Sequence, residues 1–242
     1  MKPNIYPDYP TLCRAAAQHV TDFIHHTPNA LVCIASGHTP IGVFHCLVDD
    51  VKNKKLDISS CTFISLDEWI GIPPQQEGSC RHMMDKDFFG PLGIPESQIV
   101  FFNGLSKTPQ QDCEQMNHFI ASHGGLDIML VGVGTNGHIA MNEPGTSFES
   151  YAHVSHLSEE TKAVGQKYFP SQTELSTGLT LGLRHLKEAK LPIIMASGER
   201  KATILKQALS QQPTEQVPVS IVQHFHHGFL MLDQQAASAL DR

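Results

Sequence analysis

The sequence predicts an α/β fold, a single doubly wound and mostly parallel sheet with helices on both faces. Short, continuously apolar runs, typical of strands buried on both faces, alternate with amphipathic segments whose apolar residues recur every three or four positions. The chain of 242 residues shows no internal repeat and no linker long enough to separate domains. We therefore expect one Rossmann-like domain over residues 1–242.

The first strand is expected over Ala30–Ala35, where every residue is apolar. The helix after it is expected to have Thr39 as its N-cap and Pro40 at its first position, because both residue types are favoured there. The buried face of this helix is formed by Ile41, Phe44, Leu47, Val48 and Val51.

The same two patterns continue along the chain. Strands are expected over Cys61–Leu66, Ile128–Val133 and Pro192–Ala196, and helices over 113–122 and 200–209. In sheets of this kind, ligands bind beyond the carboxyl ends of the strands, where the strand order reverses. Polar or glycine-rich segments directly after strands are therefore the places to look for chemistry.

Composition excludes several classes of protein. The formal net charge of −7 argues against general nucleic-acid binding, which needs a basic surface. No stretch approaches the roughly 20 apolar residues of a membrane helix. Residues 1–9 lack the apolar run of a signal peptide, so we expect a cytoplasmic protein.

Cysteine and histidine spacing does not favour a metal centre. The six cysteines form no CxxC pair, which favours reduced thiols over disulfides or a zinc site. The histidine clusters at 25–26 and 224–227 lack the HExxH spacing that places two imidazoles on one helical face.

Ser36-Gly37-His38-Thr39-Pro40 follows the first expected strand. A glycine-bearing loop that opens a helix exposes backbone N–H groups and the positive end of the helix dipole, which suits a phosphate. The segment is neither a P-loop nor a GxGxxG motif, so an ordinary strand-to-helix turn is the alternative.

Asp67 and Glu68 follow the second expected strand. Successive residues of an extended chain point in opposite directions, so only one of these carboxylates is expected to face a ligand. The alternative is a helix N-terminus, where acidic residues are favoured. Trp69, the only tryptophan, is expected to be structural.

The segment from Gly132 to Gly145 begins at the end of the third expected strand and is rich in glycine, which indicates tight or left-handed backbone. It contains His138 and Glu143, which can converge on one substrate atom. Histidine has a reference pKa near 6.5 and therefore suits proton transfer at neutral pH. A single histidine is more often structural, but this glycine context and strand-end location favour function.

Together these segments resemble the glucosamine-6-phosphate deaminase family, within a wider group that includes 6-phosphogluconolactonases. That family carries S/T-G-x-T-P after a strand, then LDE-aromatic, then GxGxxGHIAxNEP. This sequence has SGHTP, LDEW and GVGTNGHIAMNEP in the same order. The similarity extends to residues 157–169, 177–186 and 197–209. LDEW, the Asn-Gly-His loop and TGLTLGL are most similar to the galactosamine-6-phosphate deaminase/isomerase branch.

The resemblance implies isomerisation with deamination of an amino-sugar 6-phosphate, without a cofactor or metal. The reaction would be galactosamine 6-phosphate to tagatose 6-phosphate plus ammonia, or glucosamine 6-phosphate to fructose 6-phosphate plus ammonia. Asp67 would be the base that moves a proton between C2 and C1. His138 would move a proton at the ring oxygen, and Glu143 would orient or recharge it. The phosphate would be bound by Ser36, Gly37, His38, Thr39, Lys167 and Lys201.

The sequence departs from the family pattern at several positions. Asn136 stands where the family usually has Asp; a carboxamide can orient the histidine but cannot compensate its charge, so Glu143 is expected to do more of that work. His38 stands where the phosphate loop of the family more commonly has glycine. Lys167 stands where the family often has arginine, which can bind a phosphate through two N–H groups at once. Members activated by an N-acetylated sugar phosphate carry basic residues at the positions of His153 and Ser155, so no such activation is expected.

Two other functions stay open. A 6-phosphogluconolactonase would use the same histidine but would not need Asp67 or the Asn-Glu-Pro loop. A non-catalytic sugar-phosphate sensor is a third possibility, although no basic helix-turn-helix segment precedes residue 30. The preferred epimer and the physiological direction are not fixed by the sequence, and neither is the oligomeric state, which leaves a homo-oligomer possible.

Overall fold

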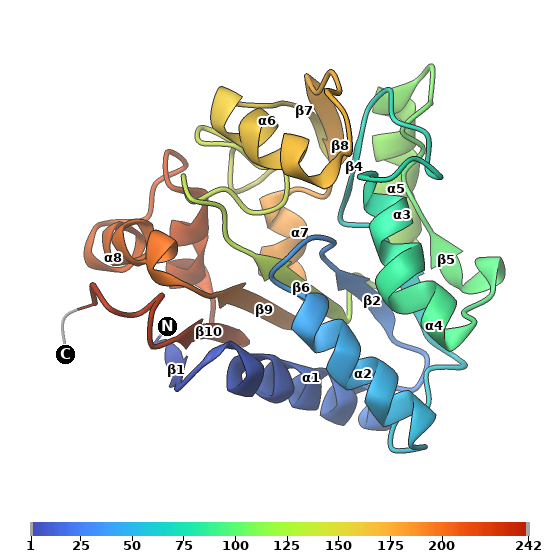
Figure 1. Cartoon of the computed structure of the whole chain (residues 1–242), viewed down its shortest axis with the longest axis horizontal. Coiled ribbons are helices and arrows are strands. Elements are labelled where there is room, and N and C mark those ends of the chain that lie inside the picture. The colour runs from blue at the N-terminus through green and yellow to red at the C-terminus, as the bar shows by residue number, and fades with distance from the viewer. Residues whose placement is uncertain (1, 241–242) are drawn as a thin grey trace.

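The computed structural model describes residues 2–240. Its larger sheet has seven strands in the order β1-β10-β9-β6-β2-β3-β5, and every pairing in it is parallel. Figure 1 shows this sheet crossing the molecule. The prediction of an α/β fold with a parallel sheet is therefore confirmed. The strands are β1 (Asn4–Tyr6), β2 (Leu31–Ile34), β3 (Thr62–Ile64), β5 (Ile99–Val100), β6 (Ile128–Gly132), β9 (Leu191–Ala196) and β10 (Phe229–Asp233).

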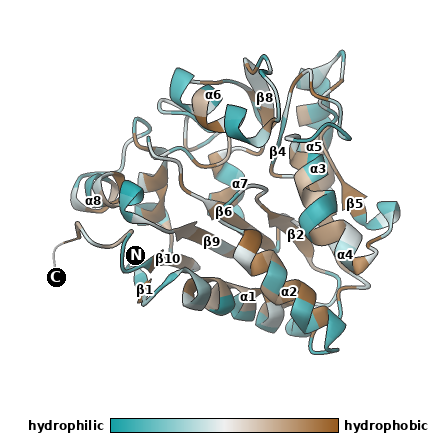
Figure 2. Ribbon diagram, viewed as in Figure 1, coloured by the Kyte–Doolittle hydropathy of each residue, from teal (hydrophilic) through white to brown (hydrophobic). Residues whose placement is uncertain are grey.

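Helices cover both faces of this sheet. Side chains of β2 alternate between the two hydrophobic cores: Val32 and Ile34 enter one, and Leu31 and Cys33 the other. In Figure 2 the strands are mostly in brown tones, while teal lies on the outer parts of the helices. One face packs against α1 (Tyr9–His26), α2 (Ile41–Lys52), α3 (Cys80–Met84) and α4 (Gly90–Leu92). The other packs against α5 (Pro109–Ser122), α7 (Leu183–Glu188) and α8 (Ala202–Ser210).

A second, smaller sheet was not predicted. It has three antiparallel strands in the order β4-β8-β7, and Figure 1 shows it beside the short helix α6. Its strands are short and rich in polar residues, so they lack the apolar runs that mark the larger sheet. The elements are β4 (Asp67–Trp69), β7 (His153–His156), β8 (Thr177–Thr180) and α6 (Glu159–Gly165).

Two sequence-based boundaries need correction. The strand expected over 61–66 ends at Ile64, and Asp67 instead begins β4 of the smaller sheet. Thr39 is not the N-cap of α2, because the helix begins at Ile41 and Pro40 precedes it in a helical conformation without a side-chain cap. The hydroxyl of Tyr9 performs that task, accepting from the Gly42 N–H at 3.0 Å.

The strand order reverses between β2 and β6. After β2 the chain adds β3 and β5 on one side, and after β6 it adds β9 and β10 on the other. Such a reversal leaves a crevice at the carboxyl ends of the two strands. The Ser36–Pro40 loop follows β2 and the Gly134–Gly145 loop follows β6, so both flank this crevice. No helix within residues 2–240 is long and apolar enough to cross a membrane.

Candidate active site

A cavity of about 740 Å³ opens at this crevice. Asn136 and Glu143 do not line it, although they lie in the same Gly134–Gly145 loop as His138, here called the histidine loop. Three further residues that the sequence did not single out, Cys80, Thr161 and Tyr168, also line it. The predicted site residues on its wall are Ser36, Gly37, His38, Thr39, Asp67, His138, Lys167 and Lys201.

The loop after β2 requires its glycine. Gly37 has φ +97°, and a Cβ there would lie 3.0 Å from the hydroxyl oxygen of Tyr168. The hydroxyl of Tyr9 donates to the Thr39 carbonyl at 2.9 Å while accepting from the first turn of α2. The loop is thereby held at the helix N-terminus, where the helix dipole favours an anion.

His38 links this loop to the segment that follows α6. Its ring stacks on that of Tyr168, with centroids 5.0 Å apart, and its Nδ1 lies 3.1 Å from the tyrosine hydroxyl oxygen. Lys167, next to Tyr168, is exposed on the cavity wall. The cavity is thus bounded on this side by residues about 130 positions apart in sequence.

Asp67 and Glu68 point in opposite directions, as the alternation of an extended chain predicts. Asp67 lines the cavity, whereas Glu68 is 1% exposed and does not. The Glu68 carboxylate accepts from the backbone N–H groups of Trp69, Cys80 and Arg81 at 2.8–2.9 Å. Glu68 therefore fixes the start of α3 against β4 and leaves Asp67 as the carboxylate available to a substrate.

Burial makes Asp67 a stronger base than an ordinary aspartate. Desolvation raises its pKa to about 6, partly opposed by the Cys80 thiol, which donates to Oδ1 at 3.4 Å. At neutral pH the group is mostly a carboxylate that can take up a proton. Burial also raises the pKa of Glu68, to about 7, despite its three N–H donors.

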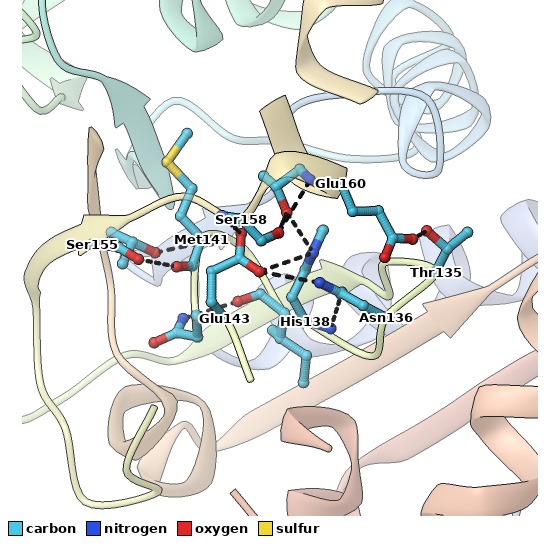
Figure 3. A network of polar contacts seen from close by, with 12 residues as sticks. Thr135, Asn136, His138, Met141, Glu143, Ser155, Ser158 and Glu160 are labelled. Carbon is cyan, nitrogen blue, oxygen red and sulfur yellow. Dashed lines mark hydrogen bonds and ion pairs between the residues drawn. The ribbon is translucent and has the colours of Figure 1, made fainter. Parts of the chain in front are cut away.

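Asn136 acts on the loop rather than on the imidazole. Its Oδ1 accepts from the His138 backbone N–H at 3.0 Å, and its Nδ2 donates to Glu143 Oε2 at 3.1 Å. Figure 3 shows Asn136 between the backbone of His138 and the carboxylate of Glu143. The carboxamide can therefore orient His138 only through the loop backbone and Glu143, because it makes no hydrogen bond to the ring itself.

His138 is half-buried and lies in a polar network. Glu143 Oε2 lies 4.0 Å from its Nδ1, and the hydroxyl oxygen of Thr161 lies 3.1 Å from the same atom. Burial lowers the pKa of His138, and the nearby carboxylate of Glu143 offsets only part of that effect. The imidazole is therefore neutral at physiological pH and can both accept and donate a proton.

Lys201 provides positive charge on the cavity wall. Burial lowers its pKa to about 8, with Glu160 opposing the shift. Glu160 accepts a hydrogen bond from the hydroxyl of Thr135. Lys201 also lowers the pKa of His138, so the two groups are close enough to interact electrostatically. At neutral pH Lys201 carries most of its charge.

Thr161, Tyr168 and Cys80 were missed because their roles depend on contacts between distant parts of the chain. Thr161 reaches His138 across 23 positions, and Cys80 reaches Asp67 across 13. Nothing in the local pattern around them indicates a ligand. Only the position of Thr161, three residues after a helix-capping serine, gave a signal, and that signal predicts a helix start.

Comparison with known proteins places this geometry in a family. The model of the glucosamine-6-phosphate isomerases/6-phosphogluconolactonase family matches residues 9–231. A glucosamine-6-phosphate deaminase of Thermoanaerobacter sp. (strain X514) is 32% identical over 241 residues, covering 99% of this chain and 95% of that protein.

Solved structures agree with this comparison. A monomeric glucosamine-6-phosphate deaminase superposes with a TM-score of 0.94 at 31% identity, covering 99% of this chain and all of that one. The 6-phosphogluconolactonase of Trypanosoma brucei shares the fold, with a TM-score of 0.78 at 19% identity over 99% of each chain. The chain therefore belongs to the glucosamine-6-phosphate isomerases/6-phosphogluconolactonase family.

Proposed function

We propose that this protein isomerises and deaminates an amino-sugar 6-phosphate, releasing ammonia and a ketose 6-phosphate. One observation carries the proposal: a buried carboxylate, Asp67, and a neutral imidazole, His138, line the same cavity as a glycine loop and a lysine. A base, a proton carrier and an anion anchor are what this reaction needs. The relatives named as glucosamine-6-phosphate deaminases support the same reaction class.

The phosphate is bound first. The backbone N–H groups of Gly37, His38 and Thr39 lie at the N-terminus of α2, where they suit an anion. Lys167 and Lys201 add positive charge from two other segments of the cavity wall. In a protein of net charge −7, this local concentration of donors is what attracts the substrate.

His138 then opens the sugar ring. The neutral imidazole accepts the proton of the anomeric hydroxyl at C1 and returns a proton to the ring oxygen, so that the C1–O5 bond breaks and an open-chain aldehyde forms. During this transfer the imidazole is transiently a cation, which the carboxylate of Glu143 stabilises from 4.0 Å.

Asp67 carries out the isomerisation. Its carboxylate removes the proton from C2, which gives an enolamine, and returns a proton to C1. The resulting iminium at C2 is hydrolysed by water, which releases ammonia and leaves the ketone. One amino-sugar phosphate and one water thus give one ketose phosphate and one ammonia.

A 6-phosphogluconolactonase is the second candidate. Lactone hydrolysis needs no base at the sugar's C2, whereas Asp67 is buried on the cavity wall with a raised pKa, about 6. That arrangement favours the deaminase. Within the deaminases, LDEW and TGLTLGL resemble the galactosamine-6-phosphate branch, and on that resemblance we propose galactosamine 6-phosphate as the preferred epimer.

The test is to measure ammonia release from galactosamine 6-phosphate and glucosamine 6-phosphate side by side, together with hydrolysis of 6-phosphogluconolactone. We expect ammonia from at least one amino sugar, with the galacto epimer preferred. Preference for the gluco epimer would agree with the proposed reaction but would contradict the assignment to the galactosamine-6-phosphate branch. Lactone hydrolysis without ammonia would refute the proposal.

The same assay tests regulation. We propose that an N-acetylated sugar phosphate does not activate the enzyme. Family members that are activated by this compound carry basic residues at two positions, which His153 and Ser155 occupy here. The Ser155 hydroxyl already donates to the Met141 carbonyl at 2.6 Å. A rise in ammonia release on adding that compound would contradict this.

A further inference from the structure

Two polar groups approach Nδ1 of His138, and the nearer one is not the residue that the sequence indicates. The hydroxyl oxygen of Thr161 lies 3.1 Å from Nδ1, within hydrogen-bonding range, whereas Glu143 Oε2 lies 4.0 Å away. Figure 3 shows a dashed line between the imidazole of His138 and the carboxylate of Glu143. The direct partner of the ring is therefore a threonine of α6.

Glu143 is already engaged by other groups. Its Oε2 accepts from the Asn136 side chain at 3.1 Å, and its Oε1 accepts from the Ser158 backbone N–H at 3.3 Å. These contacts fix the carboxylate between the histidine loop and the start of α6. From 4.0 Å it provides a negative potential on the Nδ1 side but no hydrogen bond.

The Thr161 oxygen is held in place before any substrate binds. Ser158 Oγ donates to Thr161 Oγ1 at 3.1 Å, and the Thr161 backbone N–H donates back to Ser158 Oγ at 3.2 Å. Thr161 is only 5% exposed, and its branched Cβ restricts the side-chain rotamer. The hydroxyl therefore has one defined position relative to the ring.

The imidazole is also confined by Gly134. A Cβ on Gly134 would come within 2.4–2.5 Å of three ring atoms of His138, including Nε2, so the ring lies directly against the glycine backbone. A hydroxyl at Nδ1 and a backbone surface beside Nε2 together leave the ring little freedom to rotate.

We propose that Thr161 is a positioning residue for His138, whose hydroxyl fixes the orientation of the imidazole and places the proton on Nδ1. The negative potential of Glu143 on that side favours the Nδ1–H form, in which Nδ1 donates to Thr161 Oγ1. Nε2 then presents its lone pair to the substrate. The inference rests on the proposed function, because it concerns the ring-opening proton transfer.

The test replaces the hydroxyl without changing the shape of the side chain. Thr161→Val removes the hydrogen bond but keeps the branched Cβ, and Thr161→Ser keeps the hydroxyl. We expect Thr161→Val to lower kcat about tenfold with KM changed less than about twofold, because orientation of the proton carrier is lost while phosphate binding is not. Thr161→Ser should restore kcat to within about threefold of the wild type.

Thr21→Val is the matched control. Within residues 2–240 the Thr21 hydroxyl is buried and has no hydrogen-bond partner, and Thr21 lies on α1, away from the cavity. Its substitution should leave kcat unchanged. Thermal unfolding compares the folded fraction of each variant. If Thr161→Val unfolds, Thr161→Ala, which also lacks the hydroxyl, is expected to show the same loss of kcat.

Nitrogen-15 NMR of the imidazoles gives a readout that does not depend on activity. The His138 signals, assigned by their absence in His138→Gln, should show a protonated Nδ1 in the wild type and a mixture of tautomers in Thr161→Val. Unchanged ring signals and unchanged kcat in Thr161→Val would overturn the proposal. A wild-type protein that released no ammonia would instead refute the proposed function, and the NMR comparison would still decide the role of Thr161.

Discussion

Asp67 is buried and His138 is half-buried on the cavity wall, whereas His38 and Lys167 are exposed on the same wall. Burial favours the uncharged form of both groups: the pKa of Asp67 rises, which makes it a stronger base, and the pKa of His138 falls, which keeps the imidazole neutral. Groups that must exchange protons benefit from such shifts. Groups that attract an anion need only their charge, which exposure to water preserves.

Lys201 carries a positive charge like Lys167 but is partly buried like His138. It is half-buried, and burial lowers its pKa to about 8, closer to neutral pH than an ordinary lysine. Its charge is therefore sensitive to mildly alkaline conditions. Substitutions at Asp67, Lys201 and Lys167 test this difference between shielded proton carriers and exposed anion-binding groups.

The largest effect is expected at Asp67. Asp67→Asn keeps the shape of the side chain but removes the base, so we expect kcat for ammonia release to fall on the order of a thousandfold, with KM little changed. Asp127→Asn is the matched control, because Asp127 is a buried carboxylate that accepts from the Leu31 N–H at the opposite end of the sheet. It should lose stability but not kcat. Equal loss of kcat in both variants would contradict the role of Asp67.

The next effect separates the two lysines. Lys201→Met should raise KM about thirtyfold with kcat nearly unchanged, because the substrate phosphate loses its contact with a half-buried ammonium group. Lys167→Met should raise KM only about threefold, because an exposed ion pair contributes little. Steady-state kinetics of both variants provide the measurement. The comparison fails if the exposed lysine has the larger effect.

The pH profile tests both classes at once. As pH falls below about 6, Asp67 is protonated and kcat/KM should drop; as pH rises above about 8, Lys201 loses its charge and kcat/KM should drop again. The profile of kcat should lack the alkaline limb, since bound phosphate raises the pKa of Lys201. In Lys201→Met the alkaline limb of kcat/KM should disappear; its persistence would assign that limb to another group.

The smallest effect concerns stability. The folded pKa of Asp67 is raised to about 6, so its folded state binds a proton more readily than the unfolded chain. The stabilisation of the folded state by this higher proton affinity is fully present below about pH 4 and is lost as pH rises through about 6. Asp67→Asn should therefore raise the free energy of unfolding by about 2 kcal/mol at pH 8, with the gain disappearing near pH 4. Urea unfolding at both pH values measures it, and a gain independent of pH would show that burial of the charge is not the cause.

The larger sheet could be predicted from sequence because its central strands are continuously apolar. The strands at 30–35, 128–133 and 192–196 were placed within one or two residues of β2, β6 and β9. The smaller sheet could not be predicted: β4 and β7 contain Asp67, Glu68 and two histidines, and their pairing depends on β8, more than 20 residues further along the chain.

The cavity residues were predictable to a similar extent. Glycine-rich loops after strands led to Gly37 and His138 because local backbone needs leave a pattern in the sequence. The separate roles of Asn136, Glu143 and Thr161 could not be predicted, since they depend on differences of less than 1 Å between contact distances of 3.1 Å and 4.0 Å. The sequence identifies which groups are present, and tertiary packing decides which of them touch.

The pairing of β1 with β10 has a consequence for biosynthesis. Asn4 lies opposite Met231, so nearly the whole chain separates two adjacent strands at one edge of the sheet. Because a ribosome makes the chain from its N-terminus, β1 is made first but has no partner until the last strand emerges. The middle of the sheet can form before then, and the chain's first strand is among the last to join it.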